Sequence, residues 1–230
     1  MIHRVANIIN ILKNQYNYKN IVGMARFGIK TKSAFGIPIP ELRKLAKKIG
    51  RDHVLANELW KTKIHEARLL AGFIEDPKKL TEQQMERWAK DFDSWDICDQ
   101  VCSNVFDKSP RAFDKALEWS KRKEEFVKRA GFAMMAALAV HDKEAKDKLF
   151  ANFFSSIKLA ASDERNFVKK AVNWALRQIG KRNMPLNEKA VSLAKDMAEF
   201  ESASARWIAN DALRELTSSK VLKRIQSKNN

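Results

Sequence analysis

The sequence predicts an all-α protein, and three observations carry this prediction. Its 230 residues include only 7 Gly and 5 Pro, so turn-forming residues are scarce for the length. Long runs rich in Ala, Leu, Lys and Glu favour helices, and no Asn-Gly or Asp-Gly pair offers a hairpin turn. Hydrophobic residues make up 45% of the chain, which is enough for a core. We expect a single domain over residues 1–230.

Helical patterns follow one another with short breaks. We expect helices at residues 4–15, 17–26, 40–49, 52–60, 63–75, 81–92, 94–107, 110–121, 123–140, 143–158, 163–181, 186–199, 203–217 and 219–227. The stretch KTKSAFGIPIPE (30–41) holds two prolines, which end any helix before them, so it is an expected loop. Pro40 suits the first turn of the next helix, with Glu41 beside it. We expect the last residues, IQSKNN (225–230), to fray.

A weak internal repeat runs through the helices. Residues 173–177 (NWALR) match residues 210–214 (NDALR), 37 positions later, and residues 126–130 (FVKRA) match residues 167–171 (FVKKA), 41 positions later. Helical repeats near forty residues are typical of HEAT-like or armadillo-like proteins, whose stacked helix pairs form a curved solenoid with a concave surface. An ordinary helical bundle with chance matches is the alternative.

The charge balance indicates the kind of partner. Lys and Arg number 44 against 28 Asp and Glu, which gives a net charge of +16. Such an excess suits a polyanion, most often nucleic acid. A basic protein without a specific partner is the alternative. No apolar stretch is long enough to span a membrane, and the N-terminus lacks the uninterrupted apolar core of a signal peptide.

The cysteines and histidines indicate neither a disulfide framework nor a metal site. Cys98 and Cys102 lie four positions apart on one expected helix, so they cannot staple distant parts of the fold. A reducing, cytoplasmic setting is the simplest interpretation. The four histidines are scattered and form no ligand motif, so we expect no metal ion.

The expected helix 163–181 carries two opposite stripes. The apolar stripe consists of Val168, Val172, Ala175 and Ile179. The opposite stripe holds one indole among cations and consists of Lys170, Trp174, Arg177 and Lys181. Cations at this spacing could follow a nucleic-acid backbone on a concave solenoid face, with Trp174 facing a sugar or base. In the alternative interpretation, Trp174 packs against an adjacent repeat and the cations are only solvated.

A second group lies in the stretch DFDSWDICDQVC (91–102). Trp95 and Asp99 are separated by four positions, so they are neighbours on one helical face. A carboxylate beside an indole could stabilise a developing cation, with the ring face adding cation–π attraction. The alternative is a helix cap or an ion-pair cluster, because the stretch is locally acidic, with Asp91, Asp93, Asp96 and Asp99.

A third candidate is Arg129, at the start of the nearly apolar segment 126–140. An arginine at the start of a core helix is either paired with an acid or directed at a ligand.

Together these residues carry a family resemblance over nearly the whole chain. The ordered motifs are GMARFGIK, FGIPIPELRKLAKKI, HEARLLAGFI, DSWDICDQ, FVKRAGF, DERNFVKKAVNWALRQIGKRN and ARWIANDALREL. In this order the chain resembles the AlkD-like DNA alkylation repair family, the HEAT-like-repeat alkylpurine DNA glycosylases. The resemblance implies an all-α, curved solenoid of HEAT-like (armadillo-type) repeats with a concave basic cleft.

The resemblance also implies site residues. Trp95 and Asp99 match the family's catalytic Trp-x-x-x-Asp, Arg129 its core-helix arginine, and Trp174 its second tryptophan, as one wall of an aromatic cage around the lesion. The residues expected to contact DNA are Arg26, Phe27, Lys169, Lys170, Arg177, Lys181 and Arg182. Two positions depart from the pattern: Phe27 replaces a tyrosine after Met-Ala-Arg, and Ser94 stands where a close relative carries a tryptophan.

The implied activity is hydrolysis of the N-glycosidic bond of N3- or N7-alkylated purines in double-stranded DNA, without flipping of the base. We expect a monomer that uses no cofactor and is located in the cytoplasm, on the nucleoid when it is bound to DNA. Two alternatives stay open: a non-catalytic HEAT-like module that binds DNA or senses lesions, and a helical scaffold for an acidic protein partner.

Overall fold

A computed structural model describes residues 2–227, and these residues form helices and connecting turns without any strand. The predicted all-α class is therefore confirmed. The chain divides into two compact units, Met1–Ser109 (unit 1) and Pro110–Asn230 (unit 2). The single domain expected over residues 1–230 stays a prediction. None of the helices within residues 2–227 is both long and apolar enough to cross a membrane.

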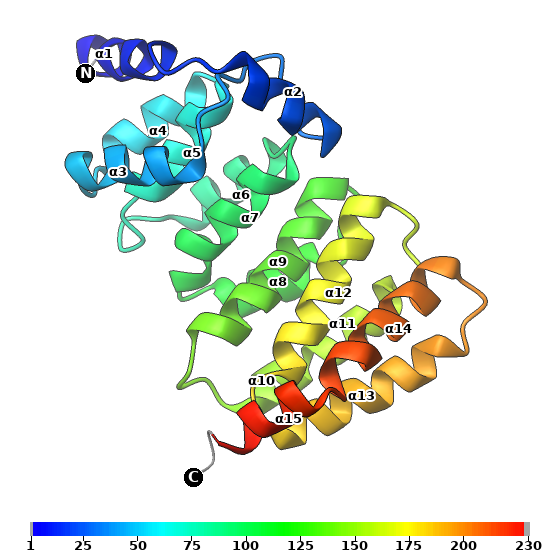
Figure 1. Cartoon of the computed structure of the whole chain (residues 1–230). Coiled ribbons are helices and arrows are strands. Elements are labelled where there is room, and N and C mark those ends of the chain that lie inside the picture. The colour runs from blue at the N-terminus through cyan, green and yellow to red at the C-terminus, as the bar shows by residue number, and fades with distance from the viewer. Residues whose placement is uncertain (1, 228–230) are drawn as a thin grey trace. The chain divides into compact units, whose positions relative to one another are not determined.

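Unit 1 is built from seven described helices and a short 3₁₀ turn: α1 (Ile2–Lys13), α2 (Tyr18–Arg26), α3 (Ile39–Ile49), α4 (His53–Lys61), α5 (His65–Ile74), α6 (Glu82–Lys90), α7 (Trp95–Asn104) and η1 (Phe106–Lys108). Helix α5 packs against α3, α4 and α7, and α1 packs on α4 and α5 (Figure 1). Between α4 and α6, the buried rings of Trp60 and Trp88 stack with centroids 4.1 Å apart.

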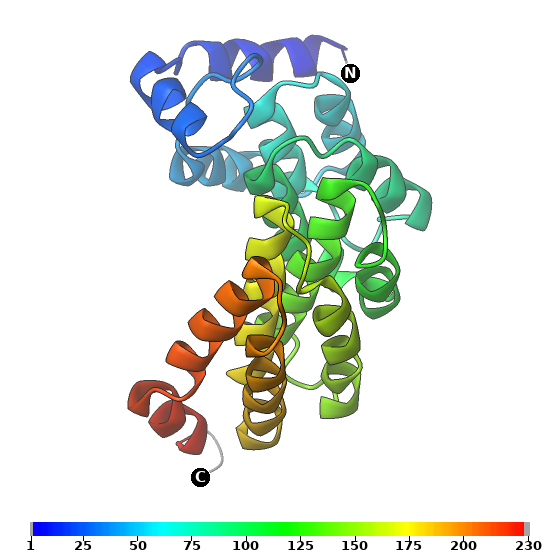
Figure 2. The same ribbon diagram turned by 90° about the vertical axis from the view of Figure 1, so that its right-hand side faces the viewer.

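Unit 2 is built from eight described helices: α8 (Ala112–Trp119), α9 (Glu125–His141), α10 (Asp147–Ala151), α11 (Phe153–Ala160), α12 (Asn166–Gly180), α13 (Met184–Ala198), α14 (Ala203–Leu216) and α15 (Ser219–Gln226). Helices α9, α12 and α14 lie side by side in one layer (Figure 1). Helices α8, α11 and α13 pack on them as a second layer, and the turned view shows α13 beside α14 (Figure 2). Two layers of successive helix pairs are the construction of a helical repeat protein.

The contact between α8 and α9 depends on a glycine. A Cβ at Gly131 would lie 2.5 Å from the backbone nitrogen of Ser120 and 2.9 Å from the carbonyl oxygen of Ala116. Backbone atoms cannot move aside as a flexible side chain can, so only glycine permits this approach.

The predicted loop is folded around one buried carboxylate. Glu66 of α5 is fully buried and accepts the backbone N–H groups of Phe35, Gly36 and Ile37 at 2.8, 2.7 and 3.3 Å. Three donors compensate the buried charge. The loop ends where α3 begins at Ile39, with Pro40 in its first turn as predicted.

The helix expected at residues 143–158 is wrong as a single element. Residues 143–146 are not helical, and Asn152 separates α10 from α11. The reason lies in side chains that satisfy the backbone in place of helical hydrogen bonds. Asp142 Oδ1 accepts the N–H of Ala145 at 2.9 Å, and the Arg182 guanidinium donates to the carbonyl oxygens of Asp142 and Ala145 at 2.7 and 3.3 Å.

The fraying expected at residues 225–230 is wrong for its first residues. Ile225 is only 1% exposed and belongs to α15, which continues to Gln226. Burial of the apolar Ile225 side chain stabilises this end of the helix by more than the conformational entropy of a frayed end would. Residues 228–230 lie outside the described residues.

Candidate nucleic-acid interface

Helix α7 positions Trp95 and Asp99. Its apolar residues Ile97, Cys98, Val101 and Cys102 are buried, and this fixes the rotation of the helix in unit 1. Trp95 and Asp99 therefore lie on the partly exposed side, one turn apart, as their spacing predicted.

Trp95 lines a cavity of about 930 Å³ formed by α2, the loop after it, α5 and the start of α7. Its indole Nε1 donates a hydrogen bond to the carbonyl oxygen of Phe27 at 3.0 Å. Arg26 and Phe27 line the same cavity, and the Phe27 side chain is 70% exposed. The structure thus brings together three residues that the sequence suggested separately. Tyr18, which is also exposed, and His65 line this cavity and were not among the predicted site residues; His65 lies in the HEARLLAGFI motif, but its place beside Trp95 depends on tertiary packing.

Asp91, Asp93 and Asp96 each have a structural partner. Asp96 Oδ2 lies 2.8 Å from His65 Nε2, and Asp96 Oδ1 accepts the Ser94 hydroxyl at 2.5 Å. Asp91 accepts the Trp60 indole N–H at 2.9 Å, and Asp93 lies 3.6 Å from the buried Arg68 guanidinium. For Asp91, Asp93 and Asp96, the ion-pair interpretation of this acidic stretch holds.

Burial alone would lower the pKa of His65, but its hydrogen bond with Asp96 and the charge of that carboxylate outweigh burial and raise it. Burial opposes the charged form of Asp96 as well, and His65 and Ser94 more than offset it, so the pKa of Asp96 is lowered. The two shifts stabilise the charged pair at the beginning of α7, beside Trp95.

Helix α12 of unit 2 shows the two predicted stripes. Val168, Val172, Ala175 and Ile179 are fully buried. On the opposite face Lys170 is exposed and Trp174 is partly exposed. The Lys169 Nζ lies 5.2 Å from the centroid of the Trp207 ring on α14, so this cation covers a second, half-exposed indole.

Two of the expected DNA contacts form ion pairs within unit 2. Arg177 donates to Glu215 Oε2 at 2.8 Å and lies 3.3 Å from Asp211 Oδ2, and Lys181 donates to Glu215 Oε1 at 2.7 Å. Burial raises the pKa of Glu215, but the two cations more than offset it, so the pKa is lowered. Carboxylates on α14 therefore neutralise part of the positive charge on α12.

Arg129 and Arg182 are held by backbone carbonyl groups. Arg129 is 5% exposed, and its Nη1 donates to the carbonyl oxygen of Phe167 at 2.5 Å. Phe126 and Phe167, which occupy matching positions of the sequence repeat, lie 5.5 Å apart between ring centroids. Arg182 stacks 3.8 Å above the Phe150 ring and donates to Ala139, Asp142 and Ala145. Through these contacts Arg182 connects the end of α12 to the segment before α10.

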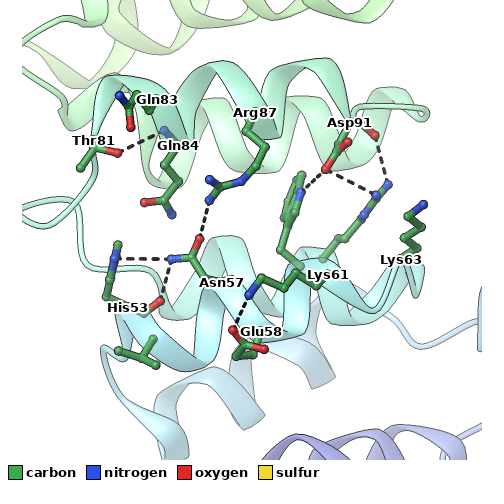
Figure 3. Close-up of a pocket in the computed structure, with 13 residues that line it drawn as sticks. His53, Asn57, Glu58, Lys61, Lys63, Thr81, Gln83, Gln84, Arg87 and Asp91 are labelled. Carbon is green, nitrogen blue, oxygen red and sulfur yellow. Dashed lines mark hydrogen bonds and ion pairs between the residues drawn. The ribbon is translucent and has the colours of Figure 1, made fainter.

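A polar cavity of about 590 Å³ lies between α4 and α6 (Figure 3). Lys61, Arg68 and Arg87 each have an acceptor that lines the same cavity. Lys61 pairs with Glu58 at 2.6 Å, and Arg87 donates to the Asn57 amide oxygen at 2.9 Å. The carboxylate of Asp91 lies 3.9 Å from the Arg68 guanidinium. No group of three His, Cys, Asp or Glu residues suited to a metal ion occurs within residues 2–227.

Comparison with known proteins places the chain in a family. The sequence model of the DNA alkylation repair enzyme matches residues 8–216. An uncharacterized protein, Lin0241 of Listeria innocua serovar 6a (strain ATCC BAA-680 / CLIP 11262), is 23% identical over 168 residues, which are 72% of this chain and 73% of that protein.

One solved structure superimposes with a TM-score of 0.75 at 23% identity, over 91% of this chain and 94% of that one. It represents a new family of proteins related to the HEAT-like repeat DNA glycosylases, with affinity for branched DNA structures. The likeness confirms the predicted fold of HEAT-like helical repeats. Because the family model spans almost the entire sequence, the chain belongs to the DNA alkylation repair enzyme family.

Proposed function

We propose that the protein is a DNA glycosylase that hydrolyses the N-glycosidic bond of N3- or N7-alkylated purines in double-stranded DNA. The observation that carries the proposal is the pair on α7. Asp99 lies one turn from Trp95, on the partly exposed side of the helix, and the Trp95 edge is fixed by its bond to Phe27. Membership in the DNA alkylation repair enzyme family supports it.

An alkylated purine is a cation and leaves with the electrons of the glycosidic bond without being protonated. Positive charge then develops on the deoxyribose, and Asp99 stabilises it and orients the water that adds to C1′. The proton of that water passes to Asp99 or to solvent. The Trp95 ring holds the sugar by cation–π attraction, which requires the ring to be fixed before the bond breaks.

In unit 2, we propose that the exposed Lys170 contacts a DNA phosphate and that the partly exposed Trp174 ring contacts the DNA. Lys169, whose Nζ lies over the Trp207 ring, would contact DNA beside Lys170 and Trp174. Arg177 and Lys181 would contribute by exchanging Glu215 for a phosphate. Arg129, which donates a hydrogen bond to the Phe167 carbonyl oxygen, would contribute to catalysis from this position. The protein would act as a monomer in the cytoplasm, without a cofactor.

The test is release of 7-methylguanine and 3-methyladenine from methylated duplex DNA. Asp99→Asn should slow release on the order of 100-fold, which corresponds to about 3 kcal/mol of transition-state stabilisation, and should leave DNA binding intact. The matched control is Asp114→Asn, an exposed carboxylate of unit 2, and it should release both bases at the wild-type rate. Equal release by wild type and Asp99→Asn would remove Asp99 from the mechanism.

A second candidate function is a non-catalytic DNA-binding protein. The solved relative with affinity for branched DNA structures favours it. It predicts tighter binding to a four-way junction than to a linear duplex of equal length, no base release, and no effect of Asp99→Asn on binding.

A further inference from the structure

A small cavity in unit 1 is lined by three cations and by no carboxylate. It has a volume of about 290 Å³ and lies where the C-terminal ends of α3, α5 and α7 meet; its lining residues are Arg43, Ala46, Lys47, Gly50, Arg51, Phe73 and Asn104. We call it the Arg43 cavity. The larger cavity between α4 and α6 differs, because Glu58 and Asp91 line it beside its cations.

Neutral groups hold the two arginines of the Arg43 cavity. The Arg43 guanidinium donates to Gln100 Oε1 at 3.0 Å and to Asn104 Oδ1 at 3.3 Å, and its Cζ lies 4.5 Å from the centroid of the Phe73 ring. Arg51 Nη1 donates to the backbone carbonyl oxygens of Phe73 and Glu75 at 3.2 and 2.6 Å. Amide and carbonyl oxygens orient a guanidinium without cancelling its charge. This is the reverse of Arg177 and Lys181, whose charge Glu215 offsets.

A fourth cation stands beside the cavity. Lys108 Nζ donates to the carbonyl oxygen of Asn104 at 2.5 Å and lies 4.0 Å from Asp107. Burial lowers the pKa of Lys108, and the positive charges of Arg51 and Arg43 lower it further, against the opposite effect of Asp107. Burial is the main cause of the shift, and the smaller effects of Arg51 and Arg43 show that these cations lie close enough to Lys108 to repel it. An anion in the cavity would relieve this repulsion.

We propose that the Arg43 cavity binds a phosphate group of the DNA backbone. Oriented guanidinium groups match phosphate oxygens, and Lys47 adds an exposed point charge. The one aromatic ring in the lining, Phe73, is covered by Arg43, so the cavity offers no surface on which a base could stack. The contact is therefore independent of base sequence. That the phosphate belongs to DNA rests on the proposed function.

The experiment measures binding of undamaged duplex DNA by fluorescence anisotropy over a range of salt concentrations. Arg43→Gln and Lys47→Gln should each weaken binding on the order of tenfold at low salt. Each should also reduce the slope of log K against log salt by about 0.9, the loss of one phosphate contact. Lys48→Gln is the matched control, since Lys48 is exposed on the same helix and does not line the cavity. It should retain the wild-type slope.

Arg43→Lys separates contact from folding, because it keeps the charge and loses the planar fork. It should bind DNA between wild type and Arg43→Gln. Lys47→Gln removes an exposed side chain, so its effect does not depend on a buried contact. Equal losses in Lys47→Gln and Lys48→Gln, or an unchanged slope in Arg43→Gln, would overturn the proposal.

Inorganic phosphate distinguishes a free anion from the DNA backbone. If phosphate raises the melting temperature of wild type but not of Arg43→Gln, while both bind DNA alike, the site belongs to a free phosphate and the backbone assignment fails. The binding assay needs no base release. If Arg43→Gln weakens DNA binding as expected but the wild-type protein releases no base, the glycosylase proposal fails and the phosphate-binding proposal stands.

Discussion

The indole Nε1 of Trp95 donates a hydrogen bond to the carbonyl oxygen of Phe27, and this bond joins the first residue of α7 to the end of α2, 68 positions earlier. Trp95 is thereby held at its edge, and its ring lies in the wall of the 930 Å³ cavity. If Trp95 holds the sugar as we propose, a ring fixed in this way loses little side-chain entropy on binding.

Trp95→Phe keeps an aromatic ring and removes the N–H donor. We expect the free energy of unfolding to fall by about 1 kcal/mol, the usual worth of one neutral hydrogen bond. Base release should fall less than in Trp95→Ala, which also removes the ring. Urea denaturation and the base-release assay check the two parts. If Trp95→Phe and Trp95→Ala were equally inactive, the fixed edge would matter more than the ring.

Glu215→Gln removes the carboxylate that offsets Arg177 and Lys181. If these cations contact phosphates, the variant should bind DNA more tightly at low salt, because Lys181 loses its ion-pair partner Glu215 and Arg177 keeps only Asp211 as an internal partner. Titration of DNA into both proteins checks this expectation. Unchanged affinity would mean that Arg177 and Lys181 do not contact DNA phosphates and have only a structural role.

The His65–Asp96 pair predicts a pH dependence of stability. The pKa of His65 is raised, so its contribution is complete below the unfolded value of about 6.5 and is lost as the pH rises through the folded value. The pKa of Asp96 is lowered, so its contribution is present above about pH 4 and is lost on acidification through the folded value. The stability difference between wild type and His65→Asn should therefore be greatest near pH 5–6. A difference that is constant from about pH 5 to 9 would contradict this.

Gly131→Ala tests the approach of α8 to α9. The added Cβ would meet backbone atoms of Ser120 and Ala116, so we expect the free energy of unfolding to fall by about 2 kcal/mol or more. Gly23→Ala on α2 is the matched control, because no atom lies within 4 Å of its added Cβ. It should be neutral or stabilise by up to about 1 kcal/mol. Thermal melts of both variants provide the measurement.

The sequence predicted those features that depend on one helix at a time. The period of α12 identified its buried face, since Val168 and Val172 have no exposed surface. The spacing of Trp95 and Asp99 likewise predicted their common side of α7. Helix type and rotation follow from local periodicity, so these predictions succeeded.

Features that depend on a partner distant in the sequence were not predicted. Glu215 meets Arg177 38 positions away, and Glu66 folds a loop 30 positions before it. The break before α10 depends on Arg182, 40 positions after Asp142. The Arg43 cavity joins the ends of three helices, and no periodicity within one helix reveals such a junction.

The burial of Cys98 and Cys102 has a consequence for a member of this family. Both thiols lie on the inner side of α7, and burial, together with the neighbouring Cys98, holds the pKa of Cys102 well above its usual range. A thiol becomes a strong nucleophile only as the thiolate. The electrophiles that methylate purines attack thiolates as well, and here they meet none at the surface of α7. The helix that carries Asp99 therefore offers such electrophiles no exposed thiol.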